Sequence, residues 1–217
     1  MSGTHLYDPG CVGNASDGMS CMHACIQMVM RTRQGGRVFS FDEINTILRR
    51  KPGLYSWSYA IADAVSQQGF SVRSVSTFAT QRFVMEGAAY LRERYGLEAG
   101  AVQIAHTDLP TVVDDARKFL ENSSIERQER VPEMEDLCRL LDEGWYVVPL
   151  VNSKRLNDQD GYSGHFVFVY GYDASDVIFH DPGLPPLVSR RTSWDAFEQA
   201  WSSPTKSVRS LMAYRPR

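Results

Sequence analysis

The sequence predicts an α+β protein in which a mainly helical part precedes a sheet-rich part. In the first two thirds, apolar residues recur at the three- and four-residue spacing of helices. In the last third, apolar runs such as residues 145–152 and 165–172 have the length of buried strands. We therefore expect one domain over residues 1–217, with a helical lobe at about 14–144 and a mainly antiparallel sheet lobe at about 145–217.

Each helix is predicted from an apolar stripe together with a start or stop signal. The first helix, at residues 21–33, is expected to stop at Gly35-Gly36. The second is expected to start at a capping box formed by Ser40 and Glu43. Further helices are expected at residues 56–69, near 82–95 and 110–121, at 131–144 with Pro132 in the first turn and Gly144 as the stop, and up to 201 from Thr192 or Ser193.

Strands are predicted from alternating or continuous apolar runs that turn residues bound. The alternation in residues 70–78 indicates a short strand directly after the Gly69 helix stop. The sheet-rich part is expected to supply the remaining strands, at residues 145–152, 165–172, 176–181 and 207–214.

The composition is typical of a globular protein that binds neither nucleic acid nor membrane. The 217 residues are 43% hydrophobic and 23% charged, with a formal net charge of −3. Basic runs such as Arg49-Arg50-Lys51 are short and isolated, as on a solvated surface. No apolar run approaches the ~18 residues of a membrane span, and the N-terminus lacks the pattern of a secretory signal. We expect a cytoplasmic protein.

The four cysteines point to metal binding or catalysis, because they form no disulfide framework in a chain of this length. Cys21 is expected at a helix N-terminus, where unpaired N–H groups and the helix dipole lower the pKa of a thiol. Cys25, one turn later, and Cys138, among leucines, are expected in the core. Cys11 lies in a loop that we expect to be exposed, which makes it the rival nucleophile.

A histidine and a carboxylate are expected to meet in the sheet. If residues 165–172 and 176–181 form a hairpin, His165 and Asp181 lie opposite each other to within about a residue, at hydrogen-bonding distance. His180 is then expected to point to the other face. The chain order Cys21, His165, Asp181 is the one that a Cys-His-Asp hydrolase needs.

The motifs around these three residues resemble a known family. The segments CMHACIQMVM (21–30), GHFVFVYGYD (164–173) and VIFHDPG (177–183) are similar to papain-like peptidases of the C39-like group. They are also similar to related proteins that are named for a guanylyl cyclase domain. The resemblance implies a papain-like fold with the active site between a helical and a sheet lobe. It also implies Cys21 as nucleophile, His165 as base and Asp181 as orienting carboxylate.

Two positions depart from the family pattern. The glycine that usually follows the nucleophile is Met22 here, and the usual upstream glutamine, an oxyanion donor, is replaced by Ala15 and Ser16. Asn14 is the amide side chain between Cys11 and the nucleophile, and Gly13 and Gly18 permit a loop that brings it closer. Asn14 is therefore the candidate oxyanion donor.

Several functions compete on these residues. The first is a cysteine hydrolase that cuts an amide bond in a peptide or protein, and the alternatives are an acyltransferase with the same thioester chemistry or a peptide-binding module without turnover. A metal site of Cys21, Cys25, His23 and either His165 or His180 is disfavoured, because His23 lies off the helix face that carries both cysteines. A nucleotide cyclase is disfavoured because no Gly-rich phosphate loop is present. We therefore expect no metal and no cofactor.

Overall fold

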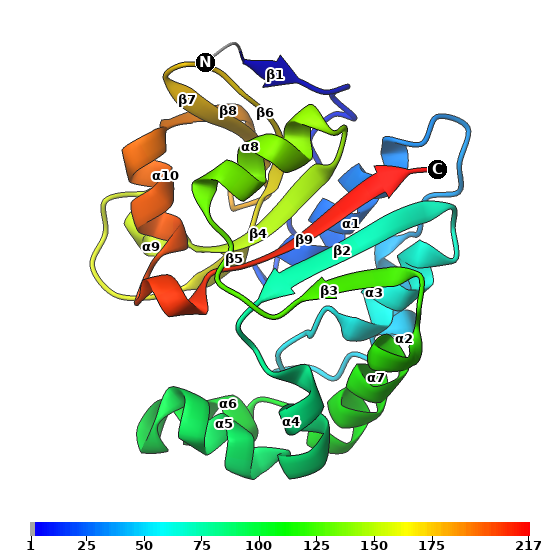
Figure 1. Cartoon of the computed structure of the whole chain (residues 1–217), viewed down its shortest axis with the longest axis vertical. Coiled ribbons are helices and arrows are strands. Elements are labelled where there is room, and N and C mark those ends of the chain that lie inside the picture. The colour runs from blue at the N-terminus through cyan, green and yellow to red at the C-terminus, as the bar shows by residue number, and fades with distance from the viewer. Residues whose placement is uncertain (1–2) are drawn as a thin grey trace.

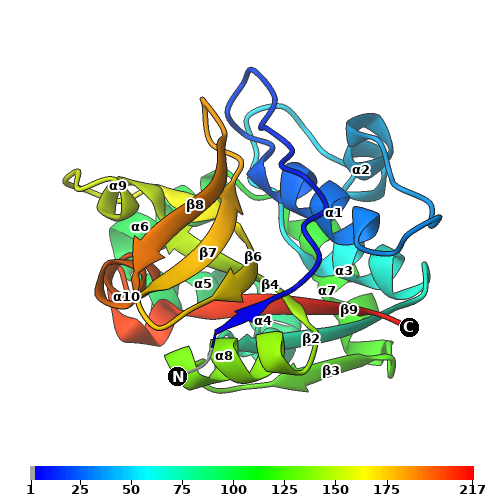
Figure 2. The same cartoon turned by 90° about the horizontal axis from the view of Figure 1, so that it is seen from above.

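The computed structural model describes residues 3–217, in which helices pack on both faces of one sheet (Figure 1, Figure 2). The helices are α1 (Cys21–Arg31), α2 (Phe41–Ile47), α3 (Tyr59–Ser66), α4 (Thr80–Glu86), α5 (Ala88–Tyr95), α6 (Leu97–Ala105), α7 (Leu109–Glu121), α8 (Met134–Asp142), α9 (Ser153–Leu156) and α10 (Trp194–Trp201). The strands are β1 (Thr4–His5), β2 (Phe70–Ser76), β3 (Ile125–Gln128), β4 (Tyr146–Asn152), β5 (Gly164–Phe166), β6 (Phe168–Tyr172), β7 (Asp176–Asp181), β8 (Leu187–Ser193) and β9 (Ser210–Pro216).

The sheet is mainly antiparallel, which confirms the predicted α+β class. Its strand order is β3-β2-β9-β4-β6-β7-β8, while β1 pairs with β6 and β5 pairs with β4. The pair β2–β3 is parallel, and the other pairs are antiparallel. β2 and β3 come from the part of the chain expected to be helical, and β9 joins them to the strands that follow residue 145 (Figure 1).

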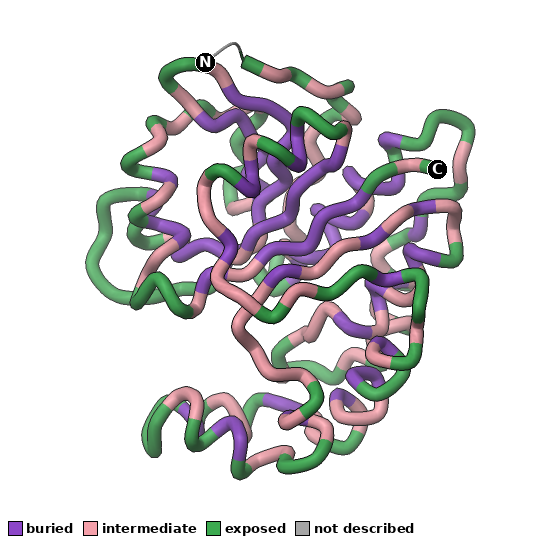
Figure 3. Tube along the Cα trace, viewed as in Figure 1, coloured by how far each residue is buried: buried purple, intermediate pink, exposed green. Residues whose placement is uncertain are grey.

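Alternation along the strands divides the interior into two cores, one on each face of the sheet. Tyr146 and Val148 of β4 belong to the core that α1, α2, α3 and α7 cover, and Val147 and Val151 belong to the core under α8 and α10. Side chains that alternate between two faces are apolar throughout only when both faces are covered. Figure 3 shows these central strands as buried.

Several element boundaries are confirmed by their capping contacts. Ser40 Oγ accepts from Glu43 N at 3.1 Å, and the Glu43 carboxylate accepts from Ser40 N at 2.8 Å, which is the predicted capping box of α2. Ser193 caps α10 by accepting from Ala196 N. β7 has the predicted bounds, and α3 ends shortly before Gly69, whose φ is +82°.

Other predictions were wrong in their details. The helix expected near residues 82–95 is two helices, because Gly87 with φ +53° interrupts it. Pro132 precedes α8, which starts at Met134, and residues 206–208 form a 3₁₀ turn before β9. The elements that were not predicted are β1, β3, β8, α6 and α9.

Across residues 3–217, the structure contains no helix long and apolar enough to cross a membrane.

Candidate active site

Cys21 is the first residue of α1, at the point where the helix meets the sheet. The side chain is half-buried, and the first N–H groups of a helix have no partner within it. The preceding Ser20 is fastened from two directions, because its N–H donates to Asn14 Oδ1 at 2.6 Å and its hydroxyl accepts from Arg50 Nη1 at 3.2 Å. Arg50 also donates to Asp17 Oδ2 at 3.0 Å. The start of α1 is thereby held in place.

His165 and Asp181 form a buried pair beside this helix start. His165 Nε2 lies 2.7 Å from Asp181 Oδ1, and the two residues are 8% and 5% exposed. The same Oδ1 accepts from Gly183 N at 2.9 Å, and Oδ2 accepts from Arg190 Nη1 at 2.9 Å. Since Nε2 faces the carboxylate, Nδ1 is the ring nitrogen left for the thiol of Cys21, beside which the imidazole lies.

The hairpin that we expected to bring this pair together is not formed. The run 165–172 is divided at Val167: β5 pairs with β4, so His165 is opposite Val151, and only β6 pairs with β7. In the β6–β7 pair Phe168 is opposite His180, and a bulge shifts the register further along. The contact between His165 and Asp181 is therefore made between strand ends and not across one ladder.

The charges of the site favour an ionised cysteine. Burial opposes ionisation of the Cys21 thiol, but the adjacent His165 imidazole outweighs burial and the thiol pKa lies below its usual value. Burial disfavours the charged form of His165 too, yet the Asp181 carboxylate and the Cys21 sulfur raise its pKa to about 9. Between these two pKa values, a thiolate and an imidazolium coexist.

The other three cysteines have thiol pKa values that are raised and not lowered. Burial raises the pKa of Cys11, and the nearby carboxylates of Asp181 and Asp8 raise it further. Cys25 is fully buried, as expected for a core residue, and burial raises its thiol pKa well above the usual value. Cys11 and Cys138 are both half-buried, and Cys138 packs at the margin of the core under α8. Only at Cys21 does the environment favour the thiolate.

His180 belongs to a different cluster, in agreement with the prediction that it points away. Its Nε2 lies 2.7 Å from Asp8 Oδ1, and its Nδ1 accepts from Ser189 N at 3.0 Å. Because Nδ1 is an acceptor there, the ring proton sits on Nε2. The ring stacks with Phe168, and it lies tilted against Tyr170 with 4.8 Å between the ring centres.

Asn14 lies in the loop before Cys21, but its amide has local partners. Its Nδ2 donates to Gly18 O at 3.0 Å, while Oδ1 accepts from Ser20 N. The backbone N–H of Asn14 donates to Pro182 O at 2.8 Å, next to Asp181. An amide nitrogen carries two hydrogens, so one of them is still available to a substrate. The oxyanion role of Asn14 stays a prediction.

A backbone donor near the thiol was not predicted. In the β4–β5 pair, Ser153 N donates to Ser163 O and Val167 N donates to Pro149 O, so odd-numbered residues of this segment bond to β4. The N–H of Phe166 therefore points away from β4, because antiparallel bonds alternate. This N–H lies near the sulfur of Cys21 and helps to lower the thiol pKa.

Asn152 fastens the 153–163 loop, which precedes His165 in the chain, and its role was also missed. Its Nδ2 donates to Gly161 O and Ser203 Oγ at 2.8 and 2.9 Å. Its Oδ1 accepts from Lys154 N and Ser163 N at 3.1 and 2.9 Å. The side chain is 1% exposed and uses its full hydrogen-bonding capacity. The sequence signal was a polar residue at the end of the apolar run 145–152, and it did not indicate these partners.

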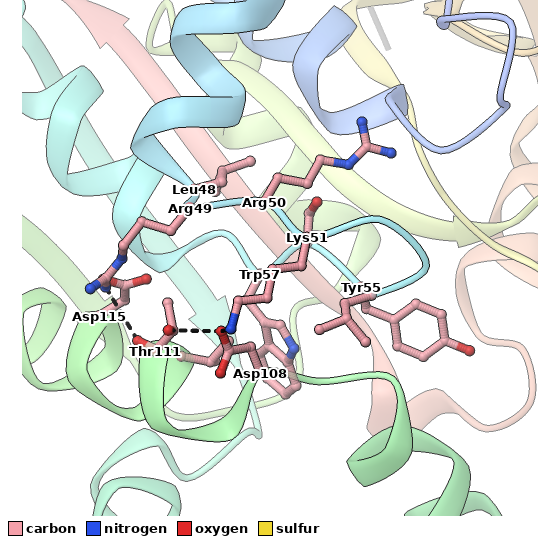
Figure 4. Close-up of a pocket in the computed structure, with 12 residues that line it drawn as sticks. Leu48, Arg49, Arg50, Lys51, Tyr55, Trp57, Asp108, Thr111 and Asp115 are labelled. Carbon is pink, nitrogen blue, oxygen red and sulfur yellow. Dashed lines mark hydrogen bonds and ion pairs between the residues drawn. The ribbon is translucent and has the colours of Figure 1, made fainter.

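Two groups of residues that could have suggested other sites have ordinary partners. Among residues 3–217, no three His, Cys, Asp or Glu side chains gather as a metal site, and His23 instead contacts Asn45 Oδ1 at 2.9 Å. A cavity of about 20 Å³ beside α7, shown in Figure 4, has charged residues that are already paired, Lys51 with Asp108, Arg49 with Asp115, and Arg50 with Asp17 outside the lining. Cys21 is not among its lining residues.

Comparison with known proteins gives a few weak similarities. No family model matches, and no curated protein is similar in sequence. The peptidase domain of Streptococcus ComA, a bifunctional ABC transporter involved in quorum sensing, is similar over 96% of this chain and 98% of its own, with 13% identity and a TM-score of 0.48. A C39-like peptidase from Bacillus anthracis is similar over 49% of this chain and 58% of its own, with 22% identity and a TM-score of 0.33.

The first of these structures is a peptidase domain, and the second is described as a C39-like peptidase. At this level of similarity, the role of each residue in this chain has to be derived from its own contacts.

Proposed function

We propose that this protein is a cysteine hydrolase that cleaves an amide bond in a peptide or protein. The observation that carries the proposal is the placement of a helix-start thiol beside an imidazole that a buried carboxylate orients. Cys21 is then the nucleophile, His165 the base and acid, and Asp181 the group that fixes the imidazole. The order and types of these residues are those of a Cys-His-Asp hydrolase.

The proposed reaction has two steps. The Cys21 thiolate attacks the carbonyl carbon, the C–N bond breaks, and the leaving amine takes the proton from His165 to give a thioester. Water then attacks the thioester while His165 accepts its proton, and the acid product leaves as Cys21 is regenerated. The backbone N–H of Cys21 is the first oxyanion donor, and the Asn14 amide is the proposed second.

The first test is the order in which the thiols react. A graded dose of a thiol-alkylating probe near neutral pH, followed by peptide mapping, should label Cys21 before Cys11 or Cys138. Burial and carboxylates raise the pKa of Cys11, whereas that of Cys21 is lowered. Earlier labelling of Cys11 or Cys138 would show that the nucleophile is misassigned.

The second test is turnover of a peptide library with the full chain and with Cys21→Ala as the control. Cleavage that requires Cys21 supports a hydrolase, and transfer of the acyl group to an added amine supports the acyltransferase alternative. Labelling of Cys21 without turnover of any amide or ester would favour a peptide-binding module.

A further inference from the structure

Asp181 makes an ion pair on the side away from the histidine, and the partner is Arg190 on β8. The guanidinium Nη1 donates to Asp181 Oδ2 at 2.9 Å, and Nη2 donates to Leu156 O at 2.6 Å. The Arg190 side chain is only 16% exposed, and its Cζ lies 5.8 Å from the centre of the Phe179 ring. The guanidinium is thus fixed at three points.

The carboxylate divides its two oxygens between these partners. Oδ1 serves His165 and Gly183 N, and Oδ2 serves Arg190. Burial raises the pKa of Asp181, but His165, the Gly183 N–H and Arg190 together hold it below its usual value. A carboxylate that is 5% exposed needs a cation or several donors to stay ionised.

The Asp181 carboxylate needs a second cation most when His165 is neutral. In the proposed reaction, His165 gives its proton to the leaving amine, after which Asp181 has no cationic partner at Oδ1. Arg190 is permanently charged and keeps its contact at Oδ2 through this step. The ionised carboxylate then holds Nε2–H in place, so Nδ1 faces the substrate.

We propose that Arg190 is a positioning residue that keeps Asp181 ionised and limits how strongly His165 holds its proton. This inference rests on the proposed function for its purpose, but the electrostatic effect can be measured without a substrate. The titratable groups around the pair are Cys21 and Cys25 of α1 and Cys11 of the N-terminal segment.

The test is a titration of the histidine rings by NMR in the full chain, with His165→Gln to assign the signal. Replacing Arg190 with a neutral residue leaves Asp181 uncompensated, so His165 should bind its proton more tightly. Arg190→Gln and Arg190→Met should each raise the His165 pKa by about one unit. Arg190→Lys keeps the charge and should stay near the wild type.

Arg191 offers a matched control one residue away. It is exposed and pairs with Asp173 and Asp176, away from the site, so Arg191→Ala should leave the titration unchanged. If Arg190 only fastens β8 to Leu156, its replacement by Gln, Met or Lys should lower the melting temperature without moving the His165 titration. That result overturns the proposal, as would an equal shift in Arg191→Ala.

Arg190→Gln and Arg190→Met are both used, so that if one of them folds poorly the other still shows whether the His165 pKa moves. A protein without turnover on any amide would contradict the hydrolase and leave the titration result standing. An active enzyme in which Arg190→Met does not move the titration would contradict only the role of Arg190.

Discussion

His180 and Asp8 form a second histidine–aspartate pair, with the same 2.7 Å separation as His165 and Asp181. The two pairs differ in what surrounds the other ring nitrogen. The Nδ1 of His180 accepts a backbone N–H from Ser189, whereas the ring of His165 lies beside the Cys21 thiol. Only the His165 pair lies beside a thiol whose pKa is lowered.

The two histidines should therefore respond differently to replacement. His165→Ala and Cys21→Ala should each abolish turnover, and Asp181→Asn should cost less, because groups that act as one unit give non-additive losses. His180→Ala should retain turnover per folded molecule, although loss of a fully buried ring lowers stability. Rates should be normalised to the folded fraction by circular dichroism. Loss of activity in folded His180→Ala, with His165→Ala active, would exchange their roles.

The pH dependence of turnover should be bell-shaped. On the acid side kcat/KM should rise as Cys21 ionises, at a pH below the usual thiol value. On the alkaline side it should fall near pH 9, where His165 loses the proton that the leaving amine requires. Alkylation of Cys21 needs only the thiolate, so its rate should show the acid limb and no alkaline fall. An alkaline limb near the ordinary histidine value would contradict the raised pKa.

The proposed role of Asn14 as an oxyanion donor can be tested separately from its role in holding the loop before Cys21. Asn14→Ala should lower turnover by about 10²–10³ if the amide stabilises the oxyanion, while Cys21 labelling persists. Asn14→Asp keeps an acceptor for Ser20 N but lacks the donor, so it should lose turnover as well. Recovery of turnover in Asn14→Asp would assign Asn14 to the loop alone. Unchanged turnover in Asn14→Ala would remove it from the mechanism.

The Phe166 N–H should contribute to the acidity of the thiol. Phe166→Pro removes this donor without breaking a bond to β4, whereas Phe166→Ala keeps the N–H and removes the ring. In the proline variant, the acid limb of Cys21 alkylation should move to higher pH by about one unit, and in the alanine variant it should stay. Equal shifts in both would assign the effect to the ring.

Asn152 should be important for stability. Asn152→Ala removes the hydrogen bonds that the side chain makes to Gly161 O, Lys154 N and Ser163 N, and each typically contributes about 0.5–1.5 kcal/mol. The side chain of the exposed Asn157 makes one bond, to Ser153 O, so Asn157→Ala should change the free energy of unfolding by less than about 0.5 kcal/mol. Urea denaturation measures both. Similar values for the two variants would show that the Asn152 network is weak.

The sequence was informative where local signals coincide with the final structure. Helix starts could be predicted at Ser40 with Glu43 and at Ser193, because the side chains of these residues form hydrogen bonds with nearby backbone N–H groups. The strands that are buried on both faces are mostly apolar. In contrast, β3 and β8 lie at the two ends of the sheet and are rich in charged and polar residues, as edge strands often are.

Other features depend on contacts that are distant in the sequence. Gly100 lies inside α6, where a Cβ would come within 2.8 Å of Arg92 Cα, so a residue that weakens the helix pattern is needed for packing against α5. At the site, the chemistry of Cys21, His165 and Asp181 could be proposed from their order. The break at Val167 and the Arg190 contact could not, because nothing nearby in the chain encodes them.

The position of β9 has a consequence for how the chain acquires its shape. Residues 210–216 lie between β2 and β4, so they join the β2–β3 edge to the strands that carry His165 and Asp181. During synthesis, β2 and β4 cannot become members of one sheet until residue 216 has emerged from the ribosome. Such long-range pairing slows folding and leaves strand edges uncovered in the meantime. The nascent chain is therefore exposed to misassociation until β9 is inserted.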